Sequence, residues 1–258
     1  MKYDKQIRKM EKIAEELDAQ KKLNANLTRE LYDTKEILNS TLHEVRRFSA
    51  QLSRFCEKIS REANDHPTLN QAAQSAFYTA GMISSRLAYT DIELNPKAIE
   101  NQNSIRSGIF KKFDKTRRIL AEEARDRGVR VELVGESRVE IDTIPVFELL
   151  PFVLLENAIK YSPRNQVVEV IFERPLQNQL VTIKSDGPNV SEVELHDIFK
   201  KGFRGASAAS MPGEGLGLFL AKRVCDFHGI SISAAVKDRS KYELNRIKYC
   251  EFHITLEF

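Results

Sequence analysis

The chain has 258 residues, 41% hydrophobic and 30% charged, which is enough for a helical module followed by a compact α/β unit. The 40 basic and 37 acidic residues leave a net charge of +3, so nothing favours a nucleic-acid partner. No stretch comes near the roughly 18 uninterrupted apolar residues of a membrane helix. The charged N-terminus also lacks the apolar core of a signal peptide, so we expect a cytoplasmic protein.

The first 60 residues are predicted to form one long helix. They contain neither proline nor glycine, and single apolar residues recur at spacings of three and four, as at Val45, Phe48 and Leu52. This narrow seam predicts a dimeric coiled-coil arm over residues 1–34 that leads into a helical hairpin over residues 35–96. A single monomeric amphipathic helix would use a wider apolar stripe, and this alternative stays open.

A second helix is predicted to fold back on the first. The run from Asn64 to Pro67 interrupts the helix, because proline disfavours helical geometry in the residue before it. The four-three spacing resumes from Leu69 to Leu87, and Asn95-Pro96 ends the second helix. Two such hairpins, paired across a dimer, would form a four-helix bundle.

His43 is predicted to face water on the first helix of this hairpin. With Leu38, Thr41 and Val45 as the inward positions, it falls at the heptad position farthest from the seam, and Glu44 follows directly. Taken alone, an exposed histidine on a coiled coil is typical of a solvated surface. A catalytic role for it requires that the rest of the chain supply a phosphoryl donor.

The chain after the hairpin changes from long helices to short strands. A helix over residues 105–127, within a connector over residues 97–128, is expected to end at Gly128 as its C-cap. Pro151 predicts a kink or a late start in a later helix. Strands are expected at residues 129–133, 139–142, 167–173, 180–184, 230–236 and 250–258, and helices at 144–161, 192–199 and 215–228. This order fits an α+β fold with a mixed, largely antiparallel sheet covered by helices on one face.

Two segments of this half carry residues suited to a polyphosphate. Helical spacing places Glu156, Asn157 and Lys160 close together, and an acid, an amide oxygen and an ammonium suit a magnesium-bound polyphosphate. The second segment, Gly213 to Leu218, opens straight into an apolar helix. Its glycines let backbone N–H groups approach an anion at a helix N-terminus. Each segment alone is also compatible with an ordinary helix end.

Together and in this order, the two segments resemble the ATP-binding domain of sensor histidine kinases, within the gyrase, heat-shock chaperone, histidine kinase and mismatch-repair (GHKL) superfamily. The resemblance covers roughly residues 35–258. The matching stretches are LHEVR at 42–46 (phosphoacceptor box), LLENAIKYSP at 154–163 (asparagine box), SDGPNV at 185–190 (first glycine box), DIFKKGFRG at 197–205 (phenylalanine box) and GEGLGLFLAKRVCDFHG at 213–229 (second glycine box). Residues 205–212 resemble the mobile lid over the nucleotide.

The resemblance implies an α/β sandwich that binds ATP and Mg²⁺ and assigns roles to particular residues. His43 is implied as the phosphoacceptor, with Glu44 drawing off its ring proton and Glu156 as a further catalytic acid. Asn157 is implied as the magnesium ligand. The implied nucleotide contacts are Asn157, Lys160, Tyr161, Ser185, Asp186, Gly187, Arg204, Gly213, Gly215, Leu216 and Gly217.

The sequence also departs from the family pattern. The family's aspartate that holds the adenine amino group aligns with Ser185, and the acid Asp186 stands one place later. Asn189 replaces the next glycine, and Val153 stands where the family often has a further asparagine. A lost buried hydrogen bond costs roughly 1–3 kcal/mol, so we expect weak or altered adenine recognition. Arg47 stands where phosphatase-competent members carry Thr or Asn, so we expect the reverse activity to be poor.

The function implied by the resemblance is that of a homodimeric histidine kinase core. ATP would phosphorylate His43, and the phosphoryl group would pass to an aspartate on a separate response-regulator receiver domain. A second interpretation is a catalytically degenerate, nucleotide-sensing dimeric scaffold, which Ser185, Asn189 and Val153 favour. A third is a serine kinase of the anti-sigma type, which shares the ATP-binding fold but has no use for a long helical arm.

Overall fold

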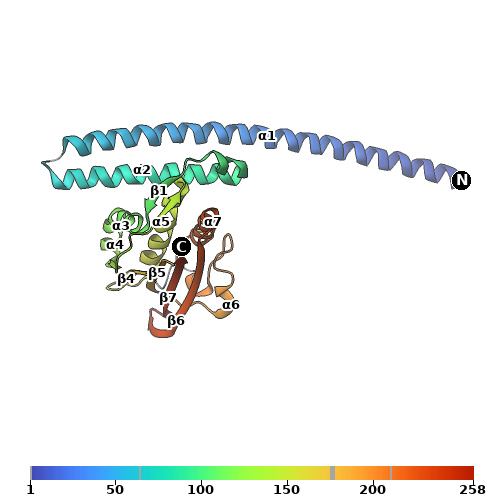
Figure 1. Ribbon diagram of the computed structural model, residues 1–258. Coiled ribbons are helices and arrows are strands. Elements are labelled where there is room, and N and C mark those ends of the chain that lie inside the picture. The colour runs from blue at the N-terminus through green and yellow to red at the C-terminus, as the bar shows by residue number, and fades with distance from the viewer. Residues whose placement is uncertain (1, 64, 175–177, 210) are drawn as a thin grey trace. The chain divides into compact units, whose positions relative to one another are not determined.

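A computed structural model describes residues 2–63, 65–174, 178–209 and 211–258, without the side chains of residues 2–8, 11, 239 and 240. The chain divides into two compact units, Met1–Gln51 and Leu52–Phe258. Helix α1 (Lys2–Glu62) forms the described part of the first unit and continues into the second (Figure 1). No helix among these residues is long and apolar enough to cross a membrane.

The predicted hairpin break is confirmed. Helix α1 ends at Glu62, and α2 (Pro67–Leu94) begins with Pro67 in its first turn, where a missing N–H leaves no hydrogen bond unmade. In the second unit, the Ser60 hydroxyl donates to Asn70 Oδ1 at 2.7 Å and ties the two helix ends together. Helix α2 ends before Asn95-Pro96, as the sequence indicates.

The single helix predicted over residues 105–127 is wrong at its start and in its middle. After the 3₁₀ helix η1 (Pro96–Asn101), Ile105–Gly108 form strand β1, which pairs antiparallel with β3 (Glu140–Thr143). This pairing across the sequence overrides local helix propensity. The helical remainder divides at Leu120 into α3 (Ile109–Ile119) and α4 (Ala121–Arg127). Gly128 ends α4 with φ of +67°, as expected of a C-cap glycine.

The main sheet is mixed and largely antiparallel, as predicted. Its strand order is β2-β4-β5-β7-β6; only β2 and β4 run parallel, and the other neighbours are antiparallel. The strands are β2 (Arg130–Val134), β4 (Val167–Glu173), β5 (Leu180–Pro188), β6 (Ser231–Leu244) and β7 (Ile247–Glu257). The last two are longer than expected because they continue into a hairpin. Its two turn residues, Asn245 and Arg246, both have positive φ, as a tight two-residue turn requires.

Several helices of this unit end or begin elsewhere than the pattern indicates. After the 3₁₀ helix η2 (Pro145–Glu148), α5 runs over Leu149–Tyr161, so Pro151 lies in its first turn and the predicted late start is confirmed. Helix α6 covers only Glu192–Leu195 and is followed by the short 3₁₀ helix η3 (Ala206–Ala208). Helix α7 covers Gly217–His228 and ends at Gly229.

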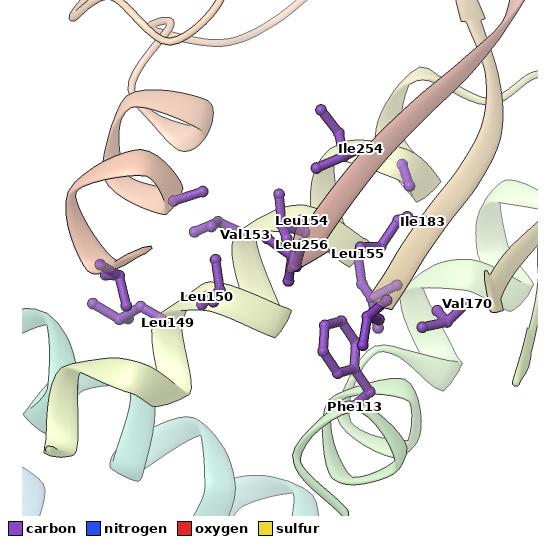
Figure 2. Close-up of a cluster of buried hydrophobic side chains, with 14 of the residues drawn as sticks. Phe113, Leu149, Leu150, Val153, Leu154, Leu155, Val170, Ile183, Ile254 and Leu256 are labelled. Atoms are coloured by element: carbon purple, nitrogen blue, oxygen red, sulfur yellow. The ribbon is translucent and has the colours of Figure 1, made fainter. Parts of the chain in front are cut away.

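The core lies between the helices and one face of the main sheet (Figure 2). Alternate residues of β4, β5 and β7 point toward α3 and α5, as period-two side-chain direction requires. The side chains labelled in Figure 2 are Phe113, Leu149, Leu150, Val153, Leu154, Leu155, Val170, Ile183, Ile254 and Leu256. Tyr89 and Ile92 of α2 join the same core, so the C-terminal part of α2 packs against the sheet unit. This core holds the inner face of α5 in place, and it thereby also positions the polar residues near the C-terminal end of that helix.

Candidate functional site

A cavity of about 420 Å³ opens beside the C-terminal part of α5. Its walls come from α5, β5, β7, the loop before α7 and the first turn of α7. Apolar side chains form much of this lining: Leu154, Ala158, Ile183, Val190, Ile198, Phe203, Leu216, Leu218, Phe252 and Ile254. An apolar cleft with a few polar groups around it is the usual form of a site for a small organic ligand.

Helix α5 contributes the polar side of the cavity. Glu156, Asn157 and Lys160 line it, as the helical spacing predicts, and so does Tyr161, which the family resemblance implies. The Lys160 ammonium lies 5.0 Å from the centre of the Tyr161 ring, so the aromatic face and the cation stand together at the rim. An ammonium and an amide oxygen close together can hold a phosphate and a metal ion.

The glycine turn lies directly against these α5 residues. A Cβ built on Gly217 would stand 2.7 Å from Asn157 Nδ2, and one on Gly213 would stand 2.5 Å from Lys160 Nζ. Gly215 has φ of +71°, and a Cβ there would collide with the Phe203 carbonyl oxygen at 2.4 Å. Two segments far apart in the sequence are therefore brought together, and the missing side chains leave the backbone at the start of α7 open to an anion. Gly215, Leu216 and Gly217 line the cavity, whereas Gly213, which was also expected to contact the nucleotide, is not among the lining residues and lies against the Lys160 ammonium.

Glu156 is held in a setting that disfavours its charge. Burial and then the nearby Glu123 raise the pKa of Glu156 above its ordinary value, although Lys160 and Arg127 act in the opposite direction. A carboxyl group with a raised pKa beside a ligand cavity is typical of a group that takes up or releases a proton.

Strand β5 divides the residues of the predicted first glycine box between the two faces of the sheet. Ser185 and Gly187 line the cavity, whereas Asp186 between them does not. The Asp186 carboxylate points to the other face, where it accepts hydrogen bonds from Lys241 Nζ at 2.9 Å and from the Tyr242 hydroxyl at 3.0 Å. The expectation that Asp186 contacts the nucleotide is therefore corrected, because alternation along the strand turns its side chain away.

The loop before α7 is held by Arg204. Its Nη2 atom donates to the carbonyl oxygens of Ala208 at 3.0 Å and Ala209 at 2.9 Å, and also to that of Met211. Arg204 also lines the cavity, as expected. The arginine thus folds the lid segment, residues 205–212, around its own guanidinium; Ser210 of this segment lies outside the described residues.

Arg86 and Asn189 are cavity residues that the sequence did not mark as ligands. Arg86 stands on α2, whose spacing predicts only helix packing, and no motif surrounds it. Asn189 differs from the family pattern by replacing a glycine, and this difference does not by itself indicate a ligand contact. The packing of α2 on the sheet unit, which brings Arg86 to the cavity, is not visible in local patterns.

His43 and Glu44 are exposed on α1 in the first unit. Leu38, Thr41 and Val45 are exposed as well, so the position of His43 relative to a dimer seam stays a prediction. An exposed imidazole is open to reaction, and an adjacent carboxylate can receive its proton.

The cavity fits a magnesium–nucleotide complex in its chemistry. The described residues contain no cluster of three or more His, Cys, Asp or Glu side chains that could hold a metal by themselves. Magnesium bound to a nucleotide needs only one or two protein oxygens, since the phosphates and water supply the rest. Asn157 Oδ1, which a Cβ on Gly217 would approach to 3.2 Å, is suited to that role.

Comparisons with known proteins identify the family that the C-terminal part of the chain matches. Residues 149–258 match the family described as histidine kinase-, DNA gyrase B- and HSP90-like ATPases. Sensor protein kinase PmrB of Pseudomonas aeruginosa is 29% identical over 113 residues, which cover 44% of this chain and 24% of PmrB. Sensor protein QseC of Salmonella typhimurium is 32% identical over 105 residues, which cover 41% of this chain and 22% of QseC. The resemblance to sensor histidine kinases with a C-terminal ATPase domain is confirmed.

A solved structure of the mycobacterial sensor histidine kinase MprB superposes with a TM-score of 0.48 at 23% identity, over 60% of this chain and 97% of that one. The chain spans about a quarter of the length of the curated relatives named above.

Proposed function

Because residues 149–258 match the histidine kinase-, DNA gyrase B- and HSP90-like ATPase family, we propose that this chain acts as the kinase core of a two-component sensor. It binds ATP with Mg²⁺ in the cavity beside α5, transfers the γ-phosphoryl group to His43, and passes it to an aspartate of a response-regulator receiver domain. The proposed active form is a homodimer.

The observation that carries this proposal is the meeting of Asn157, Lys160 and the glycine turn at one cavity rim. Lys160 supplies a positive charge for the phosphates, and the open backbone at the start of α7 supplies N–H donors. The apolar walls formed by residues such as Leu154 and Ile254 suit the flat face of a purine.

The proposed phosphoryl transfer takes place in one displacement step. A ring nitrogen of His43 attacks the γ-phosphorus, a nitrogen–phosphorus bond forms, and the bond to the β–γ bridging oxygen breaks, so ADP leaves with that electron pair. Glu44 receives the ring proton and stabilises the cation that develops. When bound at Asn157, Mg²⁺ neutralises charge on the phosphate oxygens. Glu156 holds or releases a proton beside these groups.

Labelling with γ-³²P-ATP and magnesium tests the proposal. We expect acid-labile, alkali-stable label on the chain, absent from His43→Gln and retained in His66→Gln, a control that removes another exposed histidine of the hairpin. Label that survives in His43→Gln would reject His43 as the acceptor. Absence of nucleotide binding at millimolar ATP would leave only the scaffold interpretation.

A further inference from the structure

The cavity wall formed by β5 carries neutral polar groups and no acid. The only acids among the described lining residues, Glu156 and Glu214, come from α5 and from the glycine turn. On the β5 side, the polar side chains are those of Ser185 and Asn189. A hydroxyl and a carboxamide can each donate or accept a hydrogen bond, whereas a carboxylate only accepts.

Ser185 and Asn189 face the same space. Period-two alternation along β5 puts residues 185 and 187 on one face. Asn189 follows the end of the strand at Pro188; its backbone N–H donates to the Lys248 carbonyl at 2.8 Å, and it also lines the cavity. Between them, a Cβ on Gly187 would meet no atom within 4 Å. The end of β5 and the segment that follows it therefore present two short polar side chains beside open space at Gly187, which can take a flat ring.

Asn189 has an unmet hydrogen-bonding demand in this space. Its Oδ1 atom is buried and has no hydrogen-bond partner among the described residues. A buried amide oxygen without a partner is costly, so the site gains when a ligand brings a donor to it. Ser185 is only 7% exposed, which keeps its hydroxyl in the same water-poor wall.

Asp186, the acid of this strand, cannot take the place of Ser185 and Asn189 in the cavity wall. Asp186 is 4% exposed, and Lys241 and Tyr242 hold its carboxylate on the opposite face of the sheet. Turning it into the cavity would break both hydrogen bonds that hold this buried carboxylate. The base-facing wall therefore stays neutral.

From this wall we infer that the cavity binds 6-oxo purine nucleotides, such as those of guanosine, alongside 6-amino purine nucleotides. A 6-amino group donates a hydrogen bond and a 6-oxo group accepts one. A hydroxyl or carboxamide can rotate to accept from the amino group or to donate to the oxo group. A carboxylate in the wall would accept from the amino group and repel the oxo group. The inference rests on the proposed function, since it concerns which nucleotide the kinase core uses.

Calorimetry of the full chain with magnesium and either ADP or GDP tests this inference. We expect the two dissociation constants to lie within about tenfold of each other, since one neutral hydrogen bond is at stake in each case. In Ser185→Asp, the ratio of the GDP dissociation constant to the ADP dissociation constant should be at least about tenfold larger than in the natural chain. Thr182→Asp adds the same charge to the polar face of β5, where Thr182 contacts Thr255, and should leave the ratio unchanged.

A preference of the natural chain for ADP over GDP by more than about a hundredfold would overturn the inference and leave the proposed kinase function standing. Failure of both nucleotides to bind at millimolar concentration would overturn both. The ratio measured on the natural chain decides the matter even where Ser185→Asp does not fold, which circular dichroism would reveal.

Discussion

Gly217 is required to be glycine by its neighbour Asn157. A Cβ at this position would stand 2.7 Å from Asn157 Nδ2, so a methyl group must push the amide out of place. Alanine otherwise has a high helix propensity. We predict that Gly217→Ala keeps its fold but weakens binding of ADP with magnesium about tenfold or more, as measured by calorimetry.

Gly81→Ala is the matched control, because a Cβ on Gly81 in α2 would meet no atom within 4 Å. It should leave nucleotide affinity unchanged. Equal affinities in the two variants would show that Asn157 does not hold the nucleotide.

We expect the ionised Glu156 side chain to destabilise the fold at neutral pH, although activity requires it. Since its pKa is raised in the folded chain, ionising it costs more there than in the unfolded chain, and this destabilises the fold at neutral pH. Below the ordinary value of 4.5 the group is protonated in both states and the difference disappears. We predict that Glu156→Gln melts at a higher temperature than the natural chain at pH 7.5, with little difference at pH 4.

The same variant should lose phosphoryl transfer by about a hundredfold if Glu156 handles a proton in the reaction. A variant that melts lower at pH 7.5 would mean that Lys160 and Arg127 stabilise the charge more than burial opposes it.

The α5 residues of the site are predictable from the sequence, whereas the direction of the Asp186 side chain is not. Glu156, Asn157 and Lys160 belong to one helix, so their spacing predicts that they share a rim, whereas Tyr161 follows only from the family resemblance. The direction of Asp186 depends on the phase of β5 and on Lys241 and Tyr242, which belong to a distant strand. Nothing in the residues around Asp186 specifies those partners.

At the level of elements, His228 links α7 to the start of η2. The Ile144 N–H can only donate, so His228 Nε2 must accept at 3.2 Å, and Nδ1 therefore carries the proton that it donates to the Val224 carbonyl at 2.7 Å. Burial lowers the pKa of His228, although the bond to Val224 opposes this. The neutral ring is the form that holds the two elements together.

A lowered histidine pKa gives stability that is present above the ordinary value of 6.5 and is lost as pH falls through the folded-state value. We predict that the free energy of unfolding, measured with urea, decreases as pH falls from 7.5 to 5. The decrease should be smaller in His228→Gln and unchanged in His66→Gln, which alters an exposed histidine. An unaltered pH slope in His228→Gln would contradict this assignment.

The elements themselves were predicted well where the signal is local and poorly where it is not. Pro67 and Gly128 mark helix ends because the backbone preferences of proline and glycine do not depend on distant residues. Residues 105–108 lack such a mark, since their strand exists only by pairing with residues 140–143.

At the level of the whole molecule, α1 presents large apolar side chains that no described residue covers. Leu31 is 57% exposed, Leu38 38% and Phe55 56%. A repeating apolar seam on a long helix is typical of a surface for a second helix. This is the feature that the proposed homodimer would use.

We predict that the chain sediments as a dimer in analytical ultracentrifugation, and that the double variant Leu31→Glu/Leu38→Glu sediments as a monomer. Charges in a coiled-coil seam remove apolar burial and repel each other across the pair. Glu36→Gln, which changes an exposed charge on the same helix, should remain dimeric. A natural chain that is monomeric at tens of micromolar would contradict the dimer.

The measurement that tests the account most directly is the position of the phosphoryl group. After incubation with ATP and magnesium, the chain is digested at alkaline pH, which preserves phosphohistidine, and its peptides are sequenced by mass spectrometry. We predict phosphate on His43 and on none of the other four histidines, His66, His196, His228 and His253. Phosphate on another histidine or on a serine, with His43 unmodified, would contradict the account.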